Sequence, residues 1–128
     1  MVFEDGEQTR DFVHVSDIVQ ANLLALETDR ANYQTINIGT GYPISINEIS
    51  LMLARGLGKD IRPEITGKYR EGDIRHCVAD ISRARTLLGY EPKVTLSDGI
   101  PELLEWVRQQ QAAEATQITE LEQHQLVR

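Results

Sequence analysis

The 128-residue sequence predicts a small mixed α/β lobe, and three observations lead to this prediction. Short segments rich in β-branched and aromatic residues alternate with segments that have the apolar periodicity of helices. Capping and glycine signals separate the two kinds of segment. The strand segments are few and short, so they could not build a large parallel sheet by themselves. We therefore expect a lobe that needs a partner domain.

The first strand and helix are expected close to the N-terminus. Residues 9–15 predict a strand because aromatic and β-branched side chains are frequent there. Ser16 and Asp17 then open a helix that continues to about Glu27. The apolar stripe of this helix is expected to consist of Ile18, Val19, Leu23 and Leu26.

A second strand and helix follow in the same order. Residues 35–38 predict a short apolar strand, which ends at the glycine cluster of residues 39–41. Ser45 and Glu48 have the spacing of a capping box, in which each side chain bonds the backbone N–H of the other residue. The helix that they start should end near residues 56–58.

The next elements are shorter. Residues 62–65 predict a strand, and Pro63 marks it as an edge strand because proline cannot donate to a sheet ladder. Residues 76–78 predict another short strand. Residues 80–88 predict a short helix, with Gly89 as its left-handed stop.

The chain is expected to close with one more helix. Ser97 can cap it, and Pro101 would then lie in its first turn, where a missing N–H costs little. Residues 109–125 are rich in Gln, Ala and Glu. We expect residues 1–110 to form the lobe and residues 111–128 to form a helical extension or a flexible tail.

Bulk composition narrows the class of protein. The net charge of −7 argues against nucleic acid as a partner. No apolar run approaches the roughly 20 residues that span a bilayer, and the first residues lack the features of a signal peptide. A single cysteine, Cys77, excludes an internal disulfide and fits a reducing compartment. We therefore expect a cytoplasmic protein with neither nucleic-acid nor membrane partners.

Basic residues are concentrated in one part of this acidic chain. Residues 55–85 contain eight lysines and arginines and five acidic residues, a local balance of +3. Such a patch suits a small anionic ligand better than a long polyanion. The alternative is a solvated face of mixed charge.

Two sequence blocks combine arginine, glycine and acidic residues at predicted strand edges. They are residues 6–17, which contain Arg10, and residues 67–80, which contain Arg70 and Asp73. An arginine fork can hold phosphate oxygens with two parallel charge-assisted bonds, and a carboxylate can accept from sugar hydroxyls. The two blocks together indicate a ligand that has both phosphates and a sugar.

The order of several short motifs resembles the C-terminal half of the extended short-chain dehydrogenase/reductase family, the NAD-dependent nucleotide-sugar epimerases and dehydratases. The resemblance covers about residues 2–110 without interruption. Each motif is weak alone, but six motifs in the right order make a specific signal. They lie at residues 4–17, 37–41, 45–48, 70–80, 87–92 and 99–106.

The resemblance implies roles for three residues. Arg10 and Arg70 would contact the diphosphate of a nucleotide-sugar, the alternative being surface salt bridges with Asp11 or Glu71. Asp73 would accept from the ribose hydroxyls. The alternative for Asp73 is an ordinary turn aspartate after a glycine.

The remaining polar residues of the two blocks, including Asp11, His14 and Asp17, are interpreted as structural. Asp17 would be a first-turn helix charge, and His14 a packed strand residue. His76 and Cys77 are neighbours on a predicted strand, so they point to opposite faces and fit no zinc spacing. Cys77 is expected to be buried.

The motifs that the family uses for NAD and for catalysis are absent from this sequence. The glycine cluster at residues 39–41 is followed by Pro43 and Ser45, with no third glycine opening a helix. No tyrosine is followed four residues later by a lysine. NAD is therefore expected in the intact family enzyme but not on this chain alone, and we assign no catalytic residue here.

The resemblance as a whole implies the substrate-binding lobe of a Rossmann-type NAD-dependent sugar-nucleotide epimerase, of the 4-epimerase type. The chain would be inactive without a missing N-terminal dinucleotide-binding half. It would also form a homo-oligomer through uncovered apolar faces, such as that of the helix over residues 46–57. The alternatives are a stand-alone nucleotide-sugar-binding module and a structural or oligomerisation domain without catalysis.

Overall fold

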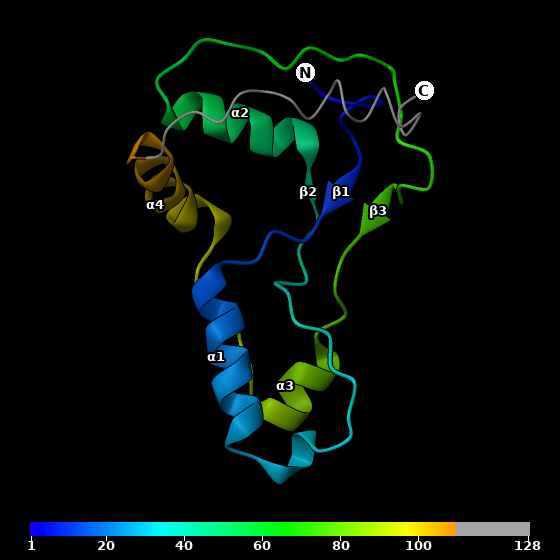
Figure 1. Cartoon of the computed structure of the whole chain (residues 1–128), viewed down its shortest axis with the longest axis vertical. Helices are drawn as coiled ribbons and strands as arrows, with labels where there is room; N and C mark the ends of the chain where they lie inside the picture. Colours follow the sequence, from blue (N-terminus) through cyan, green and yellow to red (C-terminus); the bar gives the residue numbers. More distant parts are fainter. Residues whose placement is uncertain (110–128) are drawn as a thin grey trace.

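The structure is a computed structural model that describes residues 1–109, and the sequence prediction for residues 111–128 lies outside the described residues. Four α-helices, one 3₁₀ turn and three short strands make up this part (Figure 1). In chain order they are β1 (Thr9–Arg10), α1 (Val15–Leu26), η1 (Asp29–Ala31), β2 (Ile44–Ser45), α2 (Ile46–Gly56), β3 (His76–Cys77), α3 (Ser82–Leu88) and α4 (Leu96–Gln109).

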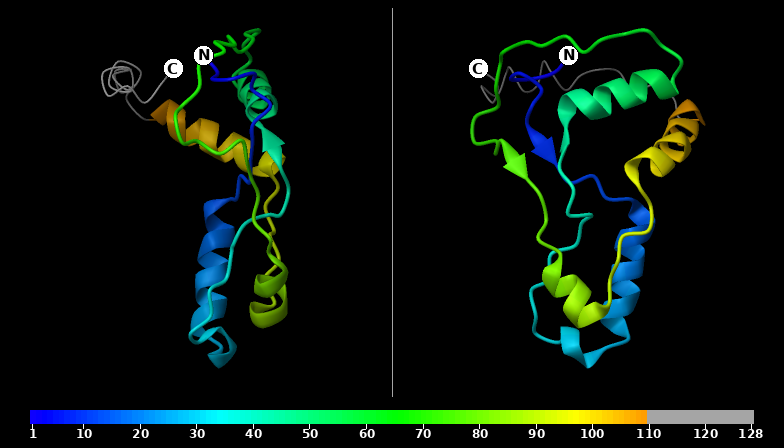
Figure 2. Two further views of the ribbon diagram at one scale, coloured as in Figure 1. Left: turned by 90° about the vertical axis from the view of Figure 1, so that its right-hand side faces the viewer. Right: turned by 180° about the vertical axis from the view of Figure 1, so that it is seen from behind.

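The elements form two tiers. The upper tier contains the three strands, α2 and α4, and the lower tier contains α1, η1 and α3 (Figures 1 and 2). Extended segments connect the tiers. The expectation of a small mixed α/β lobe is therefore confirmed. Among residues 1–109, no helix is long and apolar enough to cross a membrane.

The sheet is mixed and very narrow. Its strand order is β2-β1-β3, with β1 antiparallel to β2 and parallel to β3. Arg10 lies opposite Ile44 on one side and opposite Cys77 on the other. The predicted strand at residues 76–78 is thus confirmed over its first two residues.

The other strand predictions were too long. Only the first two residues of the segment 9–15 pair in the sheet, and its last residue, Val15, already belongs to α1. Residues 35–38 form no strand, and residues 62–65 contribute one isolated bridge, between Ile65 and Val2. A strand exists only with a neighbour, and residues 35–38 find none within residues 1–109.

The helix signals that depend on local chemistry were more accurate. The capping box is present: the Glu48 N–H donates to Ser45 Oγ at 3.1 Å, and the Ser45 N–H donates to Glu48 Oε2 at 2.8 Å. These backbone and hydroxyl donors lower the pKa of the Glu48 carboxyl. Gly89 ends α3 with φ of +66°, as expected.

Two helix starts differ from the predictions. His14 is the N-cap of α1 rather than a strand residue, because its Nδ1 accepts from the Ser16 N–H at 3.3 Å. In α4, Thr95 and not Ser97 accepts from the Asp98 N–H, at 3.3 Å. Pro101 therefore lies beyond the first turn of α4, where it removes one intrahelical hydrogen bond.

Each tier has its own small apolar core. In the lower tier the buried residues come from α1, α3 and the segments around α3; they are Ala21, Ile81, Ala84, Leu88 and Tyr90. In the upper tier α2 packs on α4 through Ala54, Ile100 and Leu104. A Cβ atom at Gly56 would overlap the Leu104 side chain, so glycine permits this close helix contact.

Helix α1 is apolar on two sides. Ala21, Leu24 and Ala25 face the core, whereas Val19, Leu23 and Leu26 of the predicted stripe are exposed. The opposite side, here called the α1 outer face, consists of Val15, Val19, Leu23 and Leu26, each between 51% and 83% exposed. Beside it lies an apolar pocket of about 440 Å³ that reaches Trp106. The uncovered apolar face was expected on the helix over residues 46–57, which is α2, but α2 packs against α4. The larger exposed apolar face is that of α1.

A buried carboxylate joins α1 to the segment before α4. Asp17 is 1% exposed, and its two oxygens accept from the backbone N–H groups of Lys93 and Val94, at 2.9 and 3.1 Å. The residue does lie in the first helical turn, as expected, but its contacts are tertiary. It holds two segments together that are 76 residues apart in sequence.

We expect Asp17→Asn to destabilise the fold by about 1–3 kcal/mol, because the new amide can accept only one of the two N–H groups and turns a donor toward the other. Urea unfolding of the full chain measures the difference. Glu27→Gln, at the exposed end of α1, is the matched control and should change the free energy of unfolding by less than about 0.5 kcal/mol. Equal stability of the two variants would contradict the role of Asp17.

We also expect the chain to self-associate through the α1 outer face, since large exposed apolar patches on folded chains usually mark contacts. Light scattering at low micromolar concentration should give a mass above the 14.5 kDa of one chain. Leu23→Glu should shift the mass toward the monomer. Ile61→Glu, at an equally exposed apolar position away from α1, should leave it unchanged. A monomer mass for the unaltered chain would refute the expectation.

Candidate functional site

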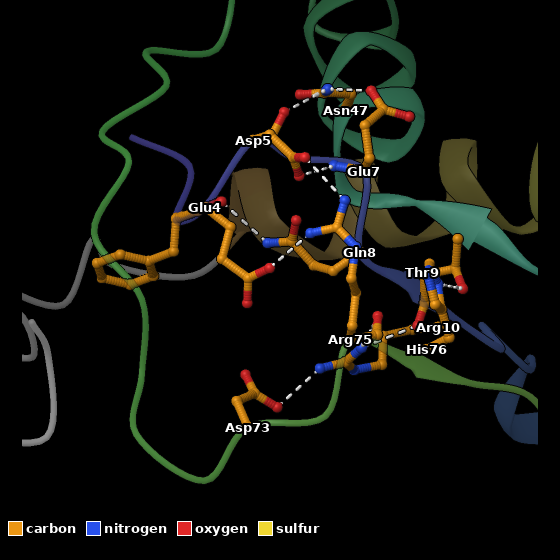
Figure 3. Close-up of polar contacts among 11 residues, drawn as sticks. Glu4, Asp5, Glu7, Gln8, Thr9, Arg10, Asn47, Asp73, Arg75 and His76 are labelled. Carbon is orange, nitrogen blue, oxygen red and sulfur yellow. Dashed lines mark hydrogen bonds and ion pairs between the residues drawn. The ribbon is translucent and has the colours of Figure 1, made fainter.

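The two sequence blocks meet beside β1 and β3, where Arg10 and Asp73 form an ion pair (Figure 3). Arg10 Nη2 donates to Asp73 Oδ1 at 2.8 Å. Arg10 Nη1 donates to two backbone carbonyls, those of Thr9 at 2.8 Å and Arg75 at 3.1 Å. The two charged side chains are 27% and 34% exposed, so they are held in place but remain accessible.

The pair keeps unused hydrogen-bonding capacity. A guanidinium group carries five N–H donors, and Arg10 uses three of them in these contacts. Among the contacts of residues 1–109, two of its donors are left for an anion. Within residues 1–109, Asp73 Oδ2 accepts no hydrogen bond, so it is open to a hydroxyl donor.

Arg70 lies in the same turn as Asp73 but does not join the ion pair. The Asp73 N–H donates to the Arg70 carbonyl at 3.1 Å, and Gly72 takes φ of +78° between them. Asp73 is therefore a turn aspartate as well as an ion-pair partner. The Arg70 side chain is exposed, and no contact among the described residues joins it to Arg10 or Asp73.

A pocket of about 390 Å³ opens beside Arg10. Its walls come from β1, β3 and the segment that was predicted as a strand; they are Arg10, Asp11, Asn37, Ile38, Cys77, Val78 and Ala79. Cys77 is exposed here rather than buried, because β3 is an edge strand of a three-stranded sheet. Within residues 1–109, no three His, Cys, Asp or Glu residues are grouped as a metal site would require.

The floor of the pocket is fixed by the carboxylate of Asp11. It accepts four hydrogen bonds: from the Thr40 N–H and hydroxyl at 2.8 and 2.6 Å, from the Gly41 N–H at 2.9 Å and from the Ala79 N–H at 3.2 Å. Burial raises the pKa of this carboxyl, but the four donors outweigh it, so its pKa is lowered. The structural interpretation of Asp11 agrees with these contacts.

The glycine cluster at residues 39–41 serves this carboxylate and not a pyrophosphate. A Cβ at Gly39 would overlap the Asp11 carboxylate and the Ala79 side chain. The Thr40 and Gly41 N–H groups already donate to Asp11, and no helix begins until Ile46. The Thr40 and Gly41 N–H donors of this cluster are thus occupied and are not available to a phosphate.

Sequence reasoning missed the contacts of Arg75. Its Nη1 donates to Glu4 Oε2 at 2.9 Å and its Nη2 donates to Asp5 Oδ2 at 2.7 Å (Figure 3). Asp5 raises the pKa of Arg75 most, and Arg75 in turn lowers the pKa of the Asp5 carboxyl, together with the Glu7 N–H. Glu4 and Asp5 belong to the first matching motif, but their 70-residue separation from Arg75 concealed the contact.

Comparison with known proteins shows the family to which this chain is similar. A sequence model described as GDP-mannose 4,6 dehydratase matches residues 1–103. The dTDP-L-rhamnose 4-epimerase of Burkholderia thailandensis is 34% identical over 109 residues, which are 85% of this chain and 30% of that protein. A putative UDP-glucose 4-epimerase of Methanocaldococcus jannaschii is 38% identical over 109 residues, 84% of this chain and 34% of that protein.

Solved structures give the same result. The UDP-glucose 4-epimerase of Thermotoga maritima with UDP-glucose is 39% identical, with a TM-score of 0.77 over 84% of this chain and 34% of the other. The UDP-glucuronic acid 4-epimerase of Bacillus cereus, in complex with UDP-glucuronic acid and NAD, is 38% identical with the same TM-score and coverage.

The chain therefore spans about a third of the length of the relatives that it matches. The family match over residues 1–103 includes the Arg10–Asp73 pair, the Asp11 contacts, helices α1, α2 and α3 and the first part of α4. The chain belongs to the epimerase/dehydratase family of extended short-chain dehydrogenases/reductases.

Proposed function

We propose that this chain is the nucleotide-sugar-binding part of an NAD-dependent nucleotide-sugar 4-epimerase. The observation that carries the proposal is the Arg10–Asp73 pair beside an open pocket, with two guanidinium donors and one carboxylate oxygen unused. A nucleotide-sugar offers an anionic diphosphate next to ribose hydroxyls, which is the complementary arrangement. Support also comes from the names of the relatives, most of which are 4-epimerases.

In this proposal each residue has a separate task. Arg10 donates to the diphosphate with its two remaining N–H groups, and Asp73 accepts from the ribose hydroxyls with Oδ2. Arg70, exposed at the other end of the turn, supplies the second positive charge. Two arginines would together neutralise a diphosphate charge near −2. The part of the reaction that belongs to this chain is binding and orientation of the substrate.

We propose that the NAD and the tyrosine–lysine pair are supplied by a separate dinucleotide-binding part. In the family these groups oxidise a sugar hydroxyl to a ketone and then reduce it from the other face. The α1 outer face and the unpaired segment 35–38 are the surfaces that such a part could cover. The free thiol of Cys77 is in keeping with a cytoplasmic location.

A stand-alone nucleotide-sugar-binding module is the second candidate, because the Arg10–Asp73 pair is complete within this chain. Both candidates require that the chain bind a nucleotide-sugar. They differ in whether a dinucleotide-binding part restores epimerisation. Addition of the N-terminal two-thirds of the Bacillus cereus enzyme to this chain, with UDP-glucuronic acid and NAD, separates them.

We expect Arg10→Ala to weaken UDP-glucose binding about 10- to 100-fold, because a charged hydrogen bond contributes about 1.5–3 kcal/mol. Arg70→Ala should weaken it less, since that side chain is not preorganised by contacts to Asp73 or Arg10. Arg85→Ala is the control: Arg85 pairs with Glu91 at an exposed site and should leave the affinity unchanged. Isothermal titration measures all three. Equal effects of Arg10→Ala and Arg85→Ala would rule out the assigned site.

We expect no measurable binding of NAD by the chain alone, because the backbone donors of residues 39–41 are already used by Asp11. Titration calorimetry with NAD tests this directly. A single site of micromolar affinity would show that the assignment of the cofactor to a separate part is wrong. Binding of UDP-glucose in the same preparation is the positive control.

A further inference from the structure

The side chain and the backbone of Arg75 make contacts in two different places. The guanidinium group reaches the turn near the N-terminus, where it pairs with Glu4 and Asp5 at 2.9 and 2.7 Å. The carbonyl oxygen of the same residue accepts from Arg10 Nη1 at 3.1 Å and from the Thr9 N–H at 3.0 Å. One residue therefore connects the N-terminal turn to the guanidinium group that we assign to the diphosphate.

The two carboxylates that hold Arg75 are themselves fixed. Glu4 takes φ of +51°, which is unusual for a residue other than glycine, and its N–H donates to the Lys68 carbonyl at 2.7 Å. The other oxygen of the Asp5 carboxylate accepts from the Glu7 N–H at 3.0 Å. A strained residue persists only where its surroundings determine its conformation. The N-terminal turn is thus a defined support for Arg75.

Apolar packing does not hold the segment between Asp73 and β3. Ile74, which lies between Asp73 and Arg75, is 57% exposed. After Arg75, the His76 side chain makes one hydrogen bond to the described residues, between Nδ1 and Thr9 Oγ1 at 2.9 Å. The ion pairs of Arg75 are therefore the main side-chain contacts that fix the position of its carbonyl oxygen.

We propose that Arg75 is a positioning residue for Arg10: held by Glu4 and Asp5, it presents its carbonyl oxygen so that the Arg10 guanidinium faces the substrate diphosphate. This proposal rests on the proposed function of Arg10. An arginine side chain has several freely rotating bonds, and ordering it at the time of binding lowers the affinity. Three acceptors at fixed places order Arg10 before the ligand arrives.

The test uses the full chain and two measurements. The first is the order of the Arg10 Nε–H group in the ligand-free chain, from ¹⁵N relaxation. The second is the dissociation constant for UDP. Arg75→Met removes the ion pairs and keeps the bulk. Arg85→Met is the matched control, because Arg85 is 48% exposed and Arg75 is 46% exposed, and each forms ion pairs at the surface.

We expect Arg75→Met to disorder the Arg10 Nε–H group and to raise the UDP dissociation constant roughly 3- to 10-fold, the effect of freeing one long side chain. Arg85→Met should change neither. Since Arg75 acts through Arg10, the double variant Arg10→Ala/Arg75→Met should bind UDP as weakly as Arg10→Ala alone. If Arg75→Met does not fold, the double variant Glu4→Ala/Asp5→Ala removes the same contacts from the other side.

Three results would decide against the proposal or against its premise. An unchanged Arg10 order in Arg75→Met would overturn it. A double variant that binds UDP clearly more weakly than Arg10→Ala would also overturn it, because Arg75 would then contact the ligand itself. Loss of Arg10 order without any UDP binding by the unaltered chain would support the positioning role and refute the proposed function of Arg10.

Discussion

The carboxylate of Asp11 is the interaction on which the rest of the structure depends. Its four donors come from Thr40, Gly41 and Ala79, so it joins three segments where the two tiers meet. Asp11 directly follows Arg10, and both residues line the same pocket. The guanidinium group that we propose to bind the diphosphate and the carboxylate that holds the fold together therefore belong to adjacent residues.

The fold uses carboxylates where larger α/β proteins use long strands. Asp11 and Asp17 both accept backbone N–H groups from segments far away in sequence, and Asp17 does so while almost fully buried. A carboxylate can accept several N–H donors at once, and charge-assisted bonds of this kind are stronger than neutral ones. With strands of only two residues, the sheet alone could not supply this connection. The structural interpretation of the two aspartates followed from the sequence, but their partners did not.

Local chemistry explains what could be predicted from the sequence. The capping box at Ser45 and Glu48 and the stop at Gly89 involve residues only a few positions apart, and both were predicted correctly. The prediction of a strand at residues 35–38 was wrong because a strand forms only where a segment distant in sequence pairs with it. The side of α1 that faces the core could not be chosen, since both sides are apolar. The motifs assigned Arg10 and Asp73 to one site. The contacts of Arg75 could be found only from the structure, because its partners are 71 and 70 residues away in sequence.

One wall of the pocket lacks backbone pairing within residues 1–109. Asn37 and Ile38 line the pocket beside Arg10, and among the described residues the N–H groups of residues 36–38 make no backbone hydrogen bond. Ile36 and Ile38 pack against the core, and the Thr35 carbonyl accepts from Arg83 Nη1 at 3.0 Å. A strand that paired with residues 36–38 would fix the position of Asn37 and Ile38 and with it the width of the pocket. If the dinucleotide-binding part that we propose supplied this strand, its docking and the binding of substrate would be coupled through the N–H groups of residues 36–38.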